Sequence, residues 1–172
     1  MHGIPNARAL KEGDIVSIDL GVTFGGYVTD AAVTVGVGAV SDEARELMQT
    51  TERSLWAGIE VARVGNRLGD ISAAIGGCAN GYGIIRGYGG HGVGRQMHMD
   101  PHIPNYGRAG TGIRLQAGMV LALEPMFSVG DPETEEISDQ WTVVMCDGQL
   151  SAHFEETVAI TGAGPEVLTR IA

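Results

Sequence analysis

The residues of this chain best suited to chemistry are carboxylates on segments that read as β-strands. Glu124 carries the strongest signal, because the apolar run Met119–Leu123 before it predicts a strand buried on both faces. An isolated charge in such a place is costly, so it must be paired or bound to a metal. Pro125 then stops the strand ladder, which places this carboxylate at the strand's end.

Two further carboxylates, Asp19 and Asp30, lie in a predicted β-hairpin over Asp14–Val35. The apolar residues of its first strand alternate with polar and small ones; they are Val16, Ile18, Leu20 and Val22. A four-residue loop at Thr23–Gly26 would place Asp19 directly opposite Asp30. Like charges so close are destabilising unless something positive lies between them. Taken alone, the hairpin could equally present its polar face to water.

The hairpin pattern recurs later in the chain. Leu10–Asp19 matches Leu115–Glu124, with leucine, glycine and carboxylate at the same spacing. Asp30 is followed by valines three and five residues later, and Glu155 by a valine and an isoleucine at the same distances. Two copies are too few for a solenoid and predict one domain with two related halves.

Histidines supply the remaining candidate ligands. Glycines flank His91, so the backbone there could approach a ligand closely, and His98 follows in the same glycine-rich segment. Four carboxylates and one histidine are too many for a single tetrahedral Zn²⁺, and they suit two divalent ions. A carboxylate-rich site favours Mn²⁺ or Fe²⁺, although Co²⁺ and Zn²⁺ also fit. His2 is a further candidate.

Hydrophobic periodicity and helix-capping residues predict the helices and strands around these candidate ligands. Ser41 or Asp42 begins a helix that runs to about Val64. Asp70 is expected to cap a second helix, which carries Cys78 on its buried stripe and ends near Gly81. The last strands are predicted over Trp141–Cys146 and His153–Thr161, and the latter places Glu155 on one face with His153 and Thr157.

Composition narrows the class of protein. The 172 residues suit a single domain spanning 1–172. A formal charge of −10 disfavours nucleic-acid binding, which needs basic patches. No apolar stretch is long enough to span a membrane, and no signal peptide is visible. Two cysteines, Cys78 and Cys146, make no disulfide framework, so the expected compartment is the cytoplasm.

Several motifs together resemble the type I methionine aminopeptidases over about residues 2–162. They are HGIP at His2–Pro5, the I-D-L…T-D hairpin, GGHGVG at Gly89–Gly94, MHMDP at Met97–Pro101, LEPM at Leu123–Met126 and HFEET at His153–Thr157. The resemblance implies the α+β pita-bread fold, a pseudo-twofold antiparallel sheet backed by helices. That fold accounts for the repeated strand pattern.

The resemblance also implies a site and a reaction. Its metal ligands are Asp19, Asp30, His91, Glu124 and Glu155, which hold two divalent ions (Fe, Mn, Co or Zn), with Asp30 and Glu155 bridging. His98, Glu124 and His2 would act in catalysis, while His2, His98, Met97 and Trp141 would contact the substrate methionine. The implied reaction is removal of the N-terminal methionine from nascent chains whose second residue is small, with transient ribosome contact.

This sequence departs from the family pattern in two ways. The family usually continues for roughly 80 residues upstream of HGIP, so an N-terminally truncated form is expected. Without the helices of that segment, the apolar face of the first strand would be exposed to solvent. This predicts either self-association through that face or low stability with weak activity. Glu156 stands where a histidine is common, and its side chain is expected to point away from the metals.

Three alternative functions remain open on the sequence. A prolidase or Xaa-Pro aminopeptidase shares the fold and the five ligands, but usually carries an extra N-terminal domain and a Glu at the position of Met99 or Asp100. A non-catalytic pita-bread binding module would typically have lost ligands, whereas all five are present here. An inactive folded fragment is not excluded by any residue.

Overall fold

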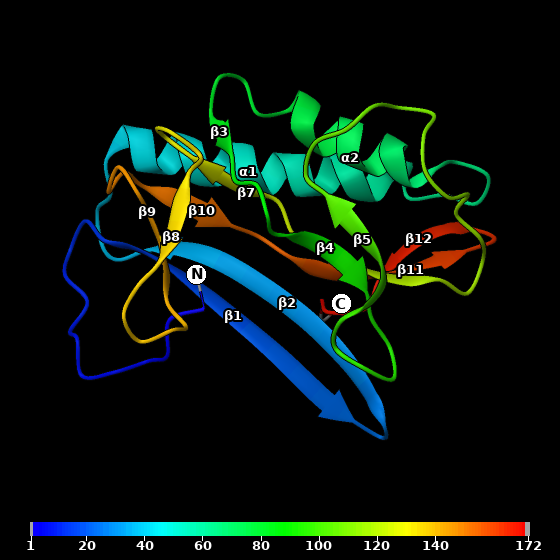
Figure 1. Ribbon diagram of the computed structural model, residues 1–172, viewed down its shortest axis with the longest axis horizontal. Coiled ribbons are helices and arrows are strands. Elements are labelled where there is room, and N and C mark those ends of the chain that lie inside the picture. The colour runs from blue at the N-terminus through cyan, green and yellow to red at the C-terminus, as the bar shows by residue number, and fades with distance from the viewer. Residues whose placement is uncertain (1, 171–172) are drawn as a thin grey trace.

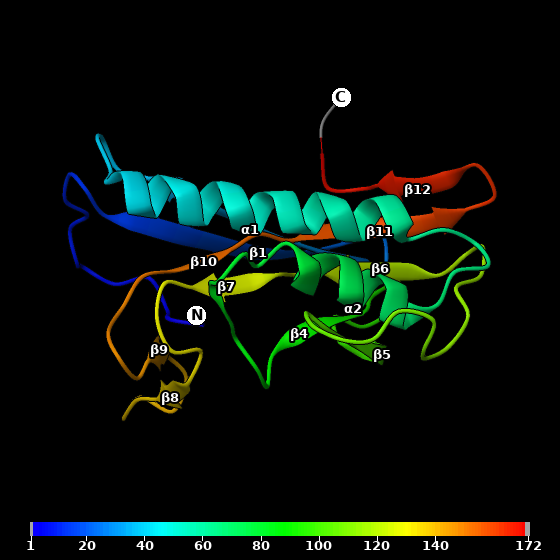
Figure 2. The same ribbon diagram turned by 90° about the horizontal axis from the view of Figure 1, so that it is seen from above.

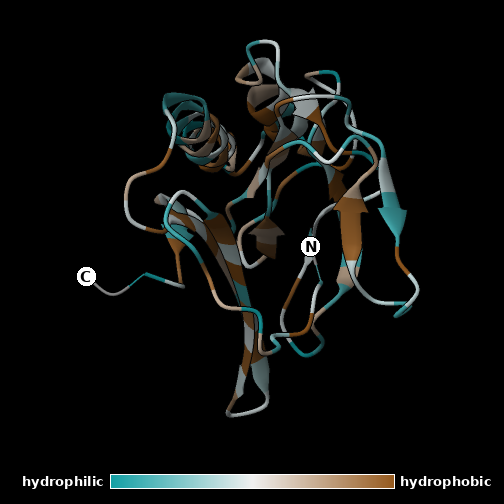
Figure 3. Cartoon of the chain, turned by 90° about the vertical axis from the view of Figure 1, so that its left-hand side faces the viewer, coloured by the Kyte–Doolittle hydropathy of each residue, from teal (hydrophilic) through white to brown (hydrophobic). Residues whose placement is uncertain are grey.

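A computed structural model describes residues 2–170 of the chain. Two helices lie side by side along one side of the strands, and a long hairpin lies on the other side (Figures 1 and 2). The helices are α1 (Asp42–Val61) and α2 (Leu68–Gly77). Hydrophobic segments run through the central strands and alternate with hydrophilic loops (Figure 3).

The strands of the described residues form four separate sheets. A five-stranded antiparallel sheet has the order β12 (Gly164–Val167), β11 (Glu156–Thr161), β6 (Val120–Leu123), β4 (Gly89–Gly92) and β5 (Met99–Pro104). A three-stranded sheet has the order β10 (Ser151–His153), β7 (Met126–Ser128) and β3 (Gly83–Ile84). The two pairs are β1 (Ile15–Phe24) with β2 (Tyr27–Gly36), and β8 (Thr134–Glu136) with β9 (Val143–Met145).

The predicted hairpin is confirmed, but the predicted register is wrong by two residues. Phe24 pairs with Tyr27, so the loop contains only two residues, Gly25 and Gly26. Both glycines have positive φ, 58° and 80°, as the tight turn of a two-residue hairpin requires. Asp19 therefore pairs with Ala32 and not with Asp30, whose partner is Gly21. The two carboxylates remain on one face as diagonal neighbours.

The first helix begins where predicted and ends at Val61, three residues early, whereas the second departs from its prediction at both ends. Ser41 caps α1, its hydroxyl accepting a hydrogen bond from the Ala44 N–H at 3.1 Å. Arg67 occupies the N-cap of α2, while the Asp70 carboxylate accepts the Arg67 N–H at 2.7 Å from inside the first turn. This helix ends at Gly77, ahead of Gly81, which leaves Cys78 half-buried at its C-cap.

The closing strand predicted over His153–Thr161 is split between two sheets. β10 pairs with β7, and β11 pairs with β6 and β12, with Phe154 and Glu155 between them. Glu155 instead forms an isolated antiparallel bridge to Ala32 of β2. The strand predicted over Trp141–Cys146 is likewise shorter, as β9. The break matters for function, because it turns the Glu155 segment toward the hairpin.

One main core joins the helices to the sheets. Leu47 and Leu55 of α1 and Ile71 and Ile75 of α2 are almost completely buried there, together with Leu121 of β6. The strand β6 is buried from Leu121 to Leu123, as its continuous apolar run predicts. Neither helix of the described residues is both long and apolar enough to cross a membrane.

Candidate metal centre

Five segments in or next to strands bring carboxylates and an imidazole to one cavity of about 200 Å³. Asp30 and Glu155 are buried, Glu124 is half-buried, and Asp19 is exposed at the cavity's edge. All five residues predicted as ligands line this cavity; they are Asp19, Asp30, His91, Glu124 and Glu155. The structure therefore places residues from positions 19 to 155 around one space.

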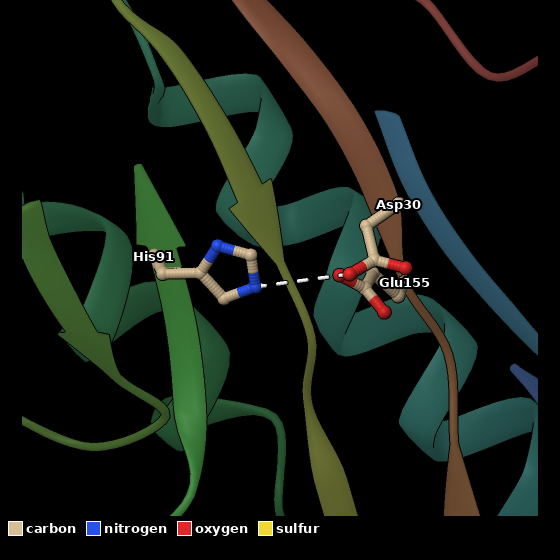
Figure 4. A group of neighbouring side chains, drawn as sticks. All are labelled: Asp30, His91 and Glu155. Carbon is tan, nitrogen blue, oxygen red and sulfur yellow. Dashed lines mark ion pairs between the residues drawn. The ribbon is translucent and has the colours of Figure 1, made fainter. Parts of the chain in front are cut away.

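His91 lies on β4 with its ring aimed at the carboxylates (Figure 4). Its Nδ1 is 3.0 Å from the Gly92 carbonyl oxygen, which can accept only if Nδ1 carries the proton. Nε2 is then left with a lone pair, 3.9 Å from Asp30 Oδ2 and 3.8 Å from Glu124 Oε1. Burial lowers the pKa of His91, which keeps this ring neutral and able to bind a cation.

The glycines beside His91 have a packing role. A Cβ on Gly90 would lie 2.3 Å from the Ala122 carbonyl oxygen of β6, and one on Gly92 would lie 2.2 Å from the Asp100 carbonyl oxygen of β5. Glycine is therefore required for β4 to fit between its two neighbours. The sequence interpretation assigned this space to a ligand, whereas the structure fills it with the adjacent strands.

The carboxylates are held where ionisation is difficult. Burial, with the nearby Asp19 and Asp30, raises the pKa of Glu124 to about 8. Burial and the neighbouring Glu124 raise the pKa of Glu155 to about 10. Partial burial and the Asp30 charge also raise the pKa of Asp19. Carboxylates this close together are stable in their ionised forms only when a positive charge lies near them.

The donor set fits a divalent cation. Asp30, His91 and Glu155 offer ligand atoms within 4.8 Å of one another, and so do Glu124, His153 and Glu155. Two atoms that each bind a shared cation at about 2.1 Å lie at most about 4.2 Å apart, which matches the 3.8 and 3.9 Å separations around His91. Glu155 Oε1 is buried and has no hydrogen-bond partner. A carboxylate oxygen that binds a cation would have this environment in the metal-free protein.

The predicted catalytic and substrate residues divide into two groups. His2 and His98 line the cavity, and the His98 ring lies 4.5 Å from the His91 ring, centroid to centroid. Trp141 and Met97 are not among the described residues that line it. Trp141 lies 6.4 Å from the His2 ring and is 56% exposed. Met97 packs against Gly21 of the hairpin, where a Cβ would lie 2.1 Å from its terminal methyl carbon.

Three residues of this region were not predicted as site residues. Tyr88 and His102 line the cavity, and the Tyr88 ring lies 5.5 Å from the His2 ring. His153 lies behind the carboxylates, where burial lowers its pKa to about 3. The predicted sharing of one strand face by His153 and Glu155 was the only signal in the sequence that pointed to His153.

Glu156, the departure from the family pattern, does point away from the site. Its carboxylate accepts a hydrogen bond from Arg170 Nε at 2.6 Å and another from the Thr169 hydroxyl. Arg170 also lies over the Trp56 ring of α1, 4.6 Å from its centroid. Arg170 therefore connects the end of the described chain to both β11 and the first helix.

Comparisons with known proteins show which family this chain resembles. Residues 1–162 match metallopeptidase family M24. A methionine aminopeptidase of Clostridium perfringens is 53% identical over 99% of this chain and 70% of its own length. The crystal structure of the Thermotoga maritima methionine aminopeptidase aligns with a TM-score of 0.93 at 47% identity, covering 95% of this chain and 67% of that one.

A prolidase from Pyrococcus furiosus also shares the fold, at a TM-score of 0.79 and 26% identity. That alignment covers 99% of this chain but only 45% of the prolidase. The α+β pita-bread fold inferred from the sequence motifs is thus confirmed by both kinds of structure. Sequence identity and coverage together favour the aminopeptidases. This chain belongs to metallopeptidase family M24 and, within it, to the methionine aminopeptidases.

Proposed function

We propose that this chain, as a single catalytic domain, removes the N-terminal methionine from polypeptides whose second residue is small. The observation that carries the proposal is the convergence of four carboxylates and His91 on one cavity that also presents His2 and His98. The relatives at 53% and 47% identity, both methionine aminopeptidases, support the substrate class.

The five ligands would hold two divalent ions of iron, manganese, cobalt or zinc, and Asp30 and Glu155 would serve as ligands to both. Divalent cations in such a site supply Lewis acidity that makes water nucleophilic near neutral pH. Asp30 and Glu155 are the most buried carboxylates of the five-ligand set, which suits ligands that face cations on two sides. Asp19, at the cavity's edge, would complete the outer position.

Separate side chains are proposed for proton transfer, for stabilising the carbonyl oxygen and for binding the substrate. Glu124 would accept the proton of the attacking water, because its carboxylate lines the cavity beside the ligands. His98 would donate a hydrogen bond to the carbonyl oxygen as negative charge develops there. His2 would lie near the scissile nitrogen, while Trp141 beside it and Met97 would contact the methionine side chain.

A direct comparison of two substrates tests the reaction. Purified protein loaded with Mn²⁺ or Co²⁺ should hydrolyse Met-Ala-Ser and leave Ala-Pro intact, and the same sample should contain bound metal. An Asp30→Ala variant purified in parallel controls for a contaminating peptidase. Preferential cleavage of Ala-Pro would indicate a prolidase, and bound metal without turnover would indicate a binding module or an inactive fragment.

The expected partners are the N-termini of nascent polypeptides, with transient ribosome contact in the cytoplasm. The reaction class supports the first, because an initiator methionine is accessible as chains emerge. Cys78 and Cys146 are both free, which suits a reducing compartment.

Self-association is expected through the outer face of the β1–β2 hairpin. Ile18, Leu20 and Phe24 are 53%, 62% and 86% exposed on this face. Among the described strands β1 pairs with β2 alone, so its outer backbone edge has no strand partner. A contiguous exposed apolar surface of this kind marks an interaction site. Two copies that pack these apolar faces against each other would cover the exposed side chains.

A further inference from the structure

His153 lies directly behind two of the candidate ligands. Its Nε2 is 3.6 Å from Glu124 Oε2 and 3.8 Å from Glu155 Oε2. The residue is 6% exposed and is not among the described residues that line the cavity. A substrate in the cavity would therefore meet the carboxylates and not this ring.

The backbone of His153 is fixed to the hairpin. Its N–H donates to Thr34 Oγ1 at 2.9 Å, and the same hydroxyl donates to the His153 carbonyl oxygen at 2.7 Å. Ala152 and Phe154 on either side are buried in the main core. The ring is thus held in place by a segment that has little freedom to move.

Two buried atoms in this cluster have no hydrogen-bond partner: His153 Nε2 and Glu155 Oε1. Buried polar atoms without partners are rare in native proteins, so each indicates a specific role. A cation in the cavity would satisfy the Glu155 oxygen. His153 Nε2 faces two carboxylate oxygens, and His153 is not among the described residues that line the cavity.

Glu124 connects the two imidazoles. Its Oε1 lies 3.8 Å from His91 Nε2, and its Oε2 lies 3.6 Å from His153 Nε2. One oxygen is therefore directed to the ligand side and the other to the ring behind. A carboxylate that binds a cation through one oxygen is commonly held through the other by an outer hydrogen bond.

We propose that His153 is a positioning residue: its Nε2–H faces Glu124 Oε2 at 3.6 Å, just beyond hydrogen-bond distance, and its attraction for that oxygen keeps Glu124 Oε1 turned toward His91 and the cation. Glu155 Oε2 also faces this nitrogen, at 3.8 Å. His153 itself does not bind metal in this assignment. The inference rests on the proposed metal dependence, but not on the identity of the peptide substrate.

The test compares His153→Gln, which keeps an N–H donor, with His153→Leu, which fills similar space without one. Mn²⁺ or Co²⁺ binding is measured by calorimetry on folded protein. His153→Leu should bind about 10–100-fold more weakly, the range for losing an outer-shell partner, and His153→Gln should bind near the wild-type affinity. Val158→Ala, which removes core packing on β11 away from the ligands, should lower the melting temperature without changing metal affinity.

X-ray absorption on the cobalt-loaded wild type should show one imidazole ligand, from His91, and this holds even where His153→Leu fails to fold. Two imidazoles would make His153 a ligand and overturn the proposal, as would unchanged affinity in folded His153→Leu. Equal weakening in His153→Gln and His153→Leu would also overturn it. Wild type that binds no metal would instead refute the proposed metal-dependent function.

Discussion

The hydroxyl of Thr157 exchanges two hydrogen bonds with the backbone of Asp30, 127 residues earlier in the chain. The Asp30 N–H donates to Thr157 Oγ1 at 2.8 Å, and Thr157 Oγ1 donates to the Asp30 carbonyl oxygen at 2.8 Å. Ala32 and Glu155 exchange backbone hydrogen bonds of 3.2 and 2.8 Å next to this pair. These contacts bring the Asp30 and Glu155 carboxylates together across the two halves of the fold.

Thr157→Val should therefore destabilise the protein by about 1–3 kcal/mol, because two buried backbone groups of Asp30 lose their partner. The free energy of unfolding is measured by denaturant titration of the metal-free protein. Thr157→Ser, which keeps the hydroxyl, is the matched control and should lose much less. Equal losses in both variants would show that the methyl group, and not the hydrogen bonds, carries the stability.

Asp30→Ala should abolish binding of at least one divalent ion, because Asp30 is proposed as a ligand to both ions. Calorimetry with Mn²⁺ gives the stoichiometry directly. Glu135→Ala, which removes an exposed carboxylate on β8, should bind like the wild type. An unchanged number of ions in Asp30→Ala would refute the assignment of Asp30 as a shared ligand.

His98→Ala should keep its metal and lose about 10²–10³ in kcat, the scale for removal of one donor to a developing oxyanion. His91→Ala is the comparison variant and should lose metal instead, because its Nε2 faces Asp30 and Glu124. Metal content and kcat are measured on the same preparations at saturating metal. Normal turnover in His98→Ala, or metal loss equal to that of His91→Ala, would exclude the proposed role.

Metal should also stabilise the folded state, since the ligands come together only on folding. At a free metal concentration of 100 times Kd, one site contributes about 2.7 kcal/mol. For a domain of this size that is a rise of about 5–10 °C in Tm, measured by calorimetric melting with and without chelator. A Tm that is unchanged on adding metal would argue against a site assembled from the two halves.

Leu20→Lys should convert a self-associated form to monomer, because it places a charge in the apolar face of β1. Sedimentation velocity over a range of protein concentrations measures the change. Thr23→Lys adds the same charge on the opposite face of the strand and serves as the matched control. Wild type that stays monomeric at every concentration would show that this face is not an interface between copies.

The sequence by itself determined the ligand candidates and the repeated strand pattern. Glu124 was found because a carboxylate at the end of a buried apolar strand must be paired or bound to a cation. The hairpin and the first helix followed from local alternation and capping. The register of the hairpin was not determined, because loops of two and four residues both satisfy the same alternation. The pairing of Phe24 with Tyr27 in the structure decided it.

Only the tertiary structure decided which groups support the ligands. Thr157, Thr34 and His153 act across 119 to 127 residues of sequence, and their local patterns are those of ordinary strand residues. The break at Glu155 was equally hidden, because a strand that changes sheets keeps its alternation. Local sequence specifies which face a residue occupies, whereas contacts between distant segments depend on how the two halves pack against each other.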